Sequence, residues 1–335
     1  MSTKKAVATD RKLYELREDA VDALKKYRIA MRENRQLRSE LDALHEVRRN
    51  IKTHVIKPQK SDGESEATIV AVASDWHVEE EVMFSQTNGL NRYNLDIAKS
   101  RSQTFFSRIV RLARKEQQDV TIKELVLFLG GDFITGRLHE ENLEACLLRP
   151  IDATIFAQEL LNSGIKFLVE NTKLNITVVC KVGNHSRITK RVHHGTEAGN
   201  ALETMMYHNL HAKRGSERVK FVIETGYHTY MKIYDFTARF HHGHNVQYGG
   251  GVGGLTIPLN KAVHSWNLTK RADFDFLGHF HDYMTYRRFV VNGSLIGYNA
   301  FAVAIKAEYQ PPIQAFMLID KRRGKTVHIP ILFDD

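Results

Sequence analysis

Five short blocks of the sequence carry aspartate, asparagine and histidine side chains, and each follows an apolar run. Carboxylate, amide and imidazole groups together are the donors that suit two divalent cations such as Mn²⁺, Fe or Zn²⁺. Any one block is more often a turn or a surface feature. Seven of the 17 histidines fall in these blocks, however, and this favours one shared site. The blocks are Asp75-Trp76-His77, Gly130-Gly131-Asp132, Gly183-Asn184-His185, His241-His242-Gly243-His244 and Gly278-His279-Phe280-His281.

The blocks can share a site because of where they lie relative to the expected strands. In an extended chain, alternate side chains point to the same side. We therefore expect three pairs to share a face: Asp75 with His77, His242 with His244, and His279 with His281. Sites in α/β sheets usually lie at the carboxyl ends of the strands, which is where these blocks fall.

Apolar runs alternate with helical patterns after residue 67, and this predicts the order of elements. The first half alternates strand and helix, which predicts a parallel sheet with crossover helices. The last third has strands joined by short turns, which predicts antiparallel hairpins. We expect strands at 68–74, 125–129, 176–182, 219–223, 230–242, 274–277, 289–292, 313–319 and 326–332, and helices at 95–117, 154–172, 198–214 and 257–270.

Taken in order, the five blocks resemble the motif set of the calcineurin-like metallophosphoesterases over about residues 67–292. The resemblance implies an α/β fold, a four-layer sandwich of two mixed β-sheets flanked by helices, with a dinuclear metal site at the sheet ends. It also implies the role of each residue. Asp75, His77 and His281 would bind the first metal, Asp132 would bridge both, and Asn184, His242 and His279 would bind the second.

The resemblance leaves two points open. His244 is the alternative to His242 as a ligand, and His185 would face the phosphate as a general acid or transition-state stabiliser. In many relatives an acidic or histidine side chain supports that catalytic histidine. Here Thr135 and Ser186 occupy the corresponding positions, so the support of His185 is not defined by the sequence.

Residues 10–52 predict one long helix, because no proline or glycine occurs before Pro58 and small or apolar residues recur at heptad spacing. We expect a basic N-terminal helix in residues 1–56, a linker in 57–66 and the metallophosphoesterase domain in 67–335. A dimeric coiled coil is favoured over a single amphipathic helix. The two position classes are Leu13, Ala20, Tyr27, Asn34, Leu41 and Arg48, and Leu16, Ala23, Ala30, Leu37, Leu44 and Ile51.

The charge distribution favours a polyanionic partner. The net charge is +9, and residues 1–60 hold 16 Lys and Arg against 9 Asp and Glu, a net charge of +7. A basic segment also follows the third block, and we expect Arg187, Lys190 and Arg191 to bind substrate phosphates. The glycine-rich stretch 249–254 would let a bulky backbone approach. Nucleic acid is the partner that these features favour, although solvated surfaces and a plain mobile loop are the alternatives.

The sequence therefore predicts a phosphodiesterase, most simply a nuclease that hydrolyses DNA or RNA with a water activated by two metals. Mn²⁺ is preferred, with Mg²⁺, Fe, Zn²⁺ or Ni²⁺ as other choices. A phosphomonoesterase or a small-molecule or protein phosphatase is the first alternative, and an inert scaffold is the second. Two cysteines, no apolar signal core and no apolar stretch of ~18 residues predict a cytoplasmic protein without a membrane span.

Overall fold

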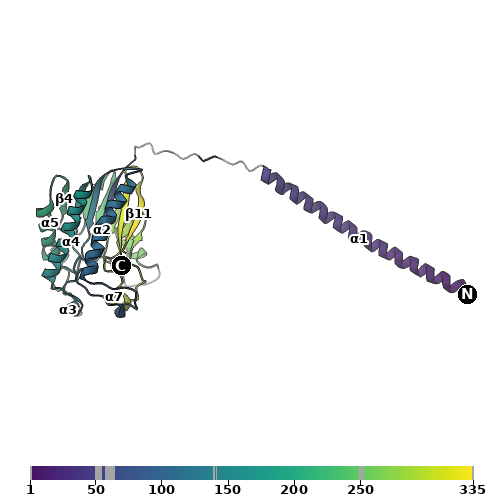
Figure 1. Ribbon diagram of the computed structural model, residues 1–335, viewed down its shortest axis with the longest axis horizontal. Coiled ribbons are helices and arrows are strands. Elements are labelled where there is room, and N and C mark those ends of the chain that lie inside the picture. The colour runs from purple at the N-terminus through teal and green to yellow at the C-terminus, as the bar shows by residue number, and fades with distance from the viewer. Residues whose placement is uncertain are drawn as a thin grey trace. The chain divides into compact units, whose positions relative to one another are not determined.

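The computed structural model describes residues 2–49, 55–56, 65–138, 140, 142–248 and 253–333 (Figure 1). The chain divides into two compact units, Met1–Lys60 and Ser61–Asp335. The first unit contains one helix, α1 (Ser2–Arg49), and the second contains every other element. Part of the expected linker, residues 57–64, lies outside the described residues, and Glu66 already begins the first strand.

The larger of two sheets confirms the parallel arrangement expected for the first half of the domain. Its strands β1 to β4 are parallel neighbours, and β10 and β11 form an antiparallel hairpin beside β1. The strands are β1 (Glu66–Ala73), β2 (Thr121–Leu129), β3 (Asn175–Cys180), β4 (Val219–Ile223), β10 (Ile313–Asp320) and β11 (Gly324–Leu332), in the order β11-β10-β1-β2-β3-β4.

The second sheet corrects two expectations. The run 230–242 is not one strand but a hairpin, because the chain reverses at Tyr234, whose φ is 54°. The last third is also not purely antiparallel, since β7 pairs in parallel with both β6 and β9. The strands are β5 (Thr229–Ile233), β6 (Phe236–Phe240), β7 (Phe274–Leu277), β8 (Met284–Thr285) and β9 (Phe289–Val291), in the order β5-β6-β7-β9-β8.

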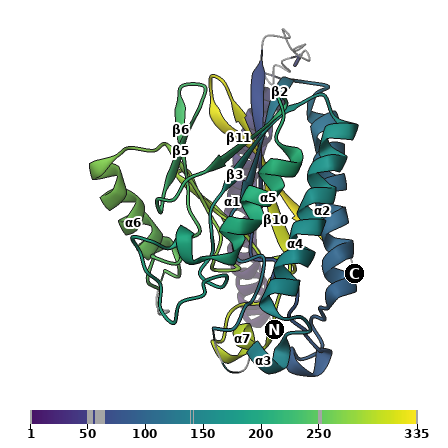
Figure 2. The same ribbon diagram turned by 90° about the vertical axis from the view of Figure 1, so that its left-hand side faces the viewer.

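The two sheets pack face to face between outer helices, which gives the four expected layers (Figure 2). Strand β1 is apolar on both faces. Val70 and Val72 pack against the second sheet, whereas Ile69 and Ala71 pack against the helices of the first. Strands buried on both faces read as continuous apolar runs, and for this reason the sequence shows them clearly.

The helices cover the outer faces of the sheets. Helices α2, α4 and α5 pack on the larger sheet, and Leu259 and Val263 of α6 pack on β7 and β9 of the smaller one. Helix α2 begins where the side chain of Asn94 accepts a hydrogen bond from the backbone N–H of Ile97. The helices are α2 (Leu95–Glu116), α3 (Asn142–Ala145), α4 (Pro150–Asn171), α5 (Leu202–Arg214), α6 (Thr256–Thr269) and α7 (Ala300–Ala304), with short 3₁₀ turns η1 (Phe84–Gln86) and η2 (Ala198–Asn200).

Helix α1 exposes the side chains of its heptad pattern. Leu13, Leu16, Leu37, Leu41 and Leu44 are each between 51% and 66% exposed. Ile51, the last position of the pattern, lies outside the described residues. Among the residues that the structure describes, no helix is both long and apolar enough to span a bilayer.

Candidate metal centre

The backbone turns sharply at the strand ends where the five blocks begin. Asp75 and His77 follow β1, Asp132 follows β2, and His279 and His281 follow β7, and all five have positive φ values between 46° and 71°. This region costs a non-glycine residue on the order of 1–3 kcal/mol, and such strain concentrates at functional sites. The expectation of an extended chain within these blocks is therefore wrong: left-handed turns, not strand alternation, aim the side chains.

Three of the expected ligands form a first group. One ligand-type atom from each of Asp75, His77 and His281 lies within 4.8 Å of the others. Nε2 of His281 is 3.5 Å from Oδ1 of Asp75, and the His77 and His281 ring centroids are 5.1 Å apart. The backbone N–H of His279 donates to both oxygens of Asp75 at 3.0 and 3.1 Å, which fixes the carboxylate in place.

Asp132, His242 and His279 form a second group by the same criterion. Nδ1 of His242 donates to the carbonyl of Gly130 at 2.7 Å, so its Nε2 is left to face the site, 2.9 Å from Oδ2 of Asp132. The two groups are adjacent, because the backbone N–H of His77 donates to the carbonyl of Asp132. His281 therefore belongs to the first group and His279 to the second, so these two side chains do not share a face as expected.

His244 does not join either group. Its Nε2 lies 2.8 Å from Oε1 of Glu197, and its ring centroid is 6.2 Å from that of His279. The geometry favours His242 as the ligand from this block, because His244 pairs with Glu197 instead.

Asn184 lies beside the second group, between two backbone groups that position it. The N–H of His185 donates to Oδ1 of Asp132 at 2.7 Å, and the N–H of Gly183 donates to Glu203 at 2.8 Å. A Cβ at Gly183 would come within 2.0 Å of Oδ1 of Asp132, so only glycine allows this approach.

The buried donor atoms fit two divalent cations. Nε2 of His77 and Oδ1 of Asn184 are buried and have no hydrogen-bond partner among the described residues, and Nε2 of His242 has only Asp132 beside it. Buried polar atoms without partners are rare unless an ion or water satisfies them. Burial lowers the pKa of His77 and of His279 well below the usual value, which keeps both imidazoles in the neutral form that binds metals. Burial opposes protonation of His242 and His281 as well, but Asp132 raises the pKa of His242 to about 10 and Asp75 raises that of His281, so these two rings would release a proton when a cation binds.

Asp132 carries the negative charge between these groups. Burial alone would raise its pKa, but the neighbouring His242 and His185 hold the pKa well below its usual value. The carboxylate is therefore ionised although its side chain is almost fully buried. This ionised carboxylate belongs to the second group, and its residue contacts His77 of the first group through the backbone.

A backbone group, not the side chain expected in relatives, supports His185. Its Nδ1 lies 2.9 Å from the carbonyl oxygen of Thr135, so Nδ1 donates and Nε2 remains free to exchange a proton. The His185 ring meets the His77 ring edge to face, with centroids 4.9 Å apart. The threonine side chain instead contacts His77: Oγ1 is 3.0 Å from Nδ1 and donates to Glu80 at 3.2 Å.

Glu203 is a functional residue that the sequence did not reveal. It lies in the first turn of α5, and its carboxylate accepts hydrogen bonds from the N–H of Phe133, the N–H of Gly183 and the hydroxyl of Ser186. Burial raises the pKa of Glu203 to about 7. This one side chain ties together the loops that carry Asp132 and Asn184, but in the sequence it resembles any acidic residue at a helix start.

We expect Glu203→Gln to lower the free energy of unfolding by about 1–3 kcal/mol, because an amide nitrogen would face a backbone N–H and leave it unsatisfied. Urea unfolding in the presence of a chelator measures this, with the exposed Glu217→Gln as the matched control. Equal stability of the two variants would show that the Glu203 carboxylate does not hold the loops.

Three solved structures show what the fold is similar to. A hypothetical protein from Pyrococcus horikoshii aligns at 14% identity and a TM-score of 0.40, covering 80% of this chain and 89% of that chain. A predicted phosphoesterase from Streptococcus pneumoniae aligns at 13% identity and a TM-score of 0.33, covering 80% of this chain and 93% of that chain. Vps29 complexed with Zn²⁺ from Entamoeba histolytica aligns at 11% identity and a TM-score of 0.31, covering 78% of this chain and 99% of that chain. No protein-family model matches the sequence, and no curated protein does.

Two of the three expected phosphate-binding residues line a cavity of about 480 Å³ beside His185. Arg187 and Lys190 are in its wall, together with Arg137, which the sequence did not single out. Arg191 is exposed and does not line this cavity. The glycine-rich stretch 249–254 lies mostly outside the described residues.

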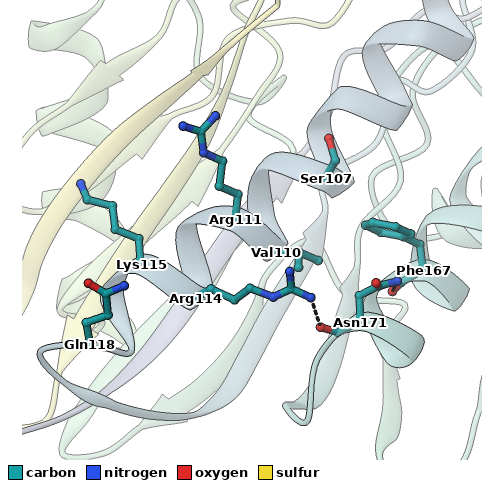
Figure 3. A pocket seen from close by; sticks show the side chains of 8 residues that line it. All are labelled: Ser107, Val110, Arg111, Arg114, Lys115, Gln118, Phe167 and Asn171. Carbon is teal, nitrogen blue, oxygen red and sulfur yellow. Dashed lines mark hydrogen bonds between the residues drawn. The ribbon is translucent and has the colours of Figure 1, made fainter.

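A separate basic cavity of about 350 Å³ lies between α2 and α4 (Figure 3). Arg111, Arg114 and Lys115 line it, and Arg114 donates to the carbonyl of Asn171 at 3.1 Å. These residues belong to the last turns of the helices, just before β2 and β3 begin. The cavity is therefore at the opposite end of the sheet from the metal-ligand groups, which follow the ends of the strands.

Proposed function

We propose that the protein is a metal-dependent phosphodiesterase that hydrolyses DNA or RNA. The observation that carries the proposal is the pair of adjacent donor groups around Asp132, with His185 held against the same carboxylate. Two divalent cations, preferably Mn²⁺, would be held by Asp75, His77 and His281 and by Asn184, His242 and His279, with Asp132 shared. When bound, such a pair supplies Lewis acidity that neutralises a phosphate and lowers the pKa of water.

The chain's own groups define the rest of the chemistry. Asp132 accepts the N–H of His185 and so sets the position of that residue relative to both groups. Nδ1 of His185 donates to the Thr135 carbonyl, so the imidazolium form of the ring delivers the proton on Nε2 to the leaving oxygen of the ester and is left as the neutral Nδ1–H imidazole. No side chain of the site has to form a covalent intermediate, since the carboxylates and imidazoles are all assigned to binding or proton transfer.

The choice of nucleic acid as substrate rests on the charge around the site. Arg137, Arg187 and Lys190 surround the cavity next to His185, and cationic side chains are the usual contacts of nucleic-acid phosphates. The segment 1–60 adds a net charge of +7, which strengthens the attraction for a polyanion.

A substrate panel tests the proposal. The full chain is incubated with Mn²⁺ and, separately, with single- and double-stranded DNA, RNA, a chromogenic phosphodiester and a chromogenic phosphomonoester. We expect cleavage of the diesters and of a polynucleotide, and loss of both on chelation. Turnover of the monoester alone would select a phosphatase, and a metal-free, inert protein would select a scaffold.

We also propose that α1 pairs with a second copy of itself as a parallel coiled coil. Its leucines are exposed at the heptad positions, and Asn34 lies at a position where a buried amide fixes a two-stranded register. With Asn34 at heptad position a and Leu37 at position d, Glu33 falls at position g and Arg38 at position e. In a parallel pair, opposite charges at these positions on the two helices attract each other.

Removal of residues 1–60 is expected to convert a dimer into a monomer and to weaken polynucleotide binding, while the metal content stays the same. Light scattering measures the mass of the particle. Leu37→Lys at a core position should have the same effect on mass, and Ser39→Lys on the outer face should have none. A monomeric full-length chain would refute the pairing.

A further inference from the structure

The cavity beside His185 is built from four separate segments of the chain. Ile134, Gly136, Arg137 and Leu138 come from the loop after β2, and His185 to Lys190 from the loop after β3. Pro150 and Leu202, the first residues of α4 and α5, close it. The loops are the same two that carry Asp132 and Asn184, so the cavity opens beside the donor groups and not at a distant surface.

The charged part of the wall suits an anion. Arg187 donates from Nη1 to the carbonyl of Asn184, while its Nε is buried and has no hydrogen-bond partner among the described residues. Arg137 and Lys190 are exposed at the same cavity, so three cationic side chains converge there.

The rest of the wall is apolar. Ile134, Leu138, Ile188 and Leu202 line it, and Ile188 exposes 68% of its surface. An apolar wall with a few cations suits a ligand that has both a flat apolar part and a phosphate. The volume of about 480 Å³ is in the range of cavities that hold one small molecule, so it suits one nucleotide unit but not a duplex.

We propose that this cavity binds the nucleotide on the leaving side of the scissile phosphate, with its base against the apolar wall and its next phosphate on Arg137 and Lys190. The inference rests on the proposed function, because His185 at the cavity mouth then protonates the oxygen that departs with this nucleotide. A base can enter only when it is unpaired. The enzyme therefore acts on single strands or on opened ends, not on intact internal duplex.

Binding to the metal-free protein tests the subsite without catalysis. The probe is a fluorescent oligothymidylate, with a matched oligouridylate to separate DNA from RNA, measured by anisotropy in a chelator over a range of salt. Arg137→Ala and Lys190→Ala are each expected to weaken binding about tenfold. Each should also reduce the slope of log K against log salt by about 0.7, as expected for one lost contact to a single strand.

Two further variants identify the kind of contact. Ile188→Ala should weaken binding by about threefold and leave the salt slope unchanged, because it removes only apolar area. Lys213→Ala, an exposed lysine near the end of α5, is the matched control and should change neither quantity. Arg187 is not used, because it also holds the Asn184 carbonyl.

Catalysis separates this inference from the proposed function. With Mn²⁺, Arg137→Ala should raise the KM for the oligonucleotide more than the KM for bis(p-nitrophenyl) phosphate, since that diester lacks the second phosphate. Lys213→Ala should leave kcat/KM unchanged for both substrates. Closed circular duplex should inhibit cleavage of the oligonucleotide to the same extent in the wild type and in Arg137→Ala, because its paired bases do not enter the cavity.

The outcomes separate the two proposals. If both diesters are cleaved but the Arg137, Lys190 and Lys213 variants bind the single strand equally well, the proposed subsite is wrong and the proposed phosphodiesterase activity stands. If no diester is cleaved with any metal, both fail.

Discussion

Replacement of Asp132 by asparagine is expected to lower phosphodiester hydrolysis by more than about 10³-fold, the largest effect of any single change in the site. The amide keeps the shape of the side chain, and its oxygen still accepts the N–H of His185. It removes the negative charge that lies 2.9 Å from Nε2 of His242 and that the proposed bridge between the two cations requires. Kinetics with Mn²⁺ and elemental analysis measure the loss of activity and of bound metal together.

Asp235→Asn is the matched control for that experiment, because Asp235 is exposed at the turn between β5 and β6, at the opposite end of β6 from His242. It should retain full activity and metal content. A fully active Asp132→Asn protein would remove the proposed bridging role.

His185→Ala is expected to slow hydrolysis of an oligonucleotide by about 10²–10⁴-fold, the range that a general acid contributes, while the metal content stays at the wild-type value. The reason is the proposed role of His185, in which the imidazolium gives the proton on Nε2 to the leaving oxygen. A p-nitrophenyl leaving group needs this proton much less, so the chromogenic diester should be affected far less than the oligonucleotide.

The loss of rate for the oligonucleotide, divided by the loss of rate for the chromogenic diester, distinguishes proton transfer from a general loss of structure. His208→Ala, an exposed histidine on α5, is the control and should change neither rate. Equal slowing of both substrates by His185→Ala would mean that His185 positions the site and does not act as the acid.

The order of the layers was predictable because the strands are buried on both faces. Residues such as those of β1 form continuous apolar runs that end where the polar blocks begin, and this pattern fixes both the strand and the edge of the sheet where the site lies. The short pairing strand β8 and the helices α3 and α7 carry no such pattern, and the sequence did not reveal them.

The side-chain directions in the site were not predictable from strand periodicity. Asp75, His77 and Asp132 adopt left-handed conformations that their residue types do not favour, and only the surrounding backbone contacts hold them there. The same limit hid Glu203, since its role depends on burial and on contacts with loops about 20 and 70 residues away. Local sequence patterns contain neither kind of information.

Anomalous scattering from crystals grown with MnCl₂ tests the central claim most directly, because it locates each ion without reference to activity. We predict two manganese peaks, one coordinated by Asp75, His77 and His281 and one by Asn184, His242 and His279, with Asp132 in contact with both. Ordered crystals of the full chain that show no manganese at these side chains would contradict the account.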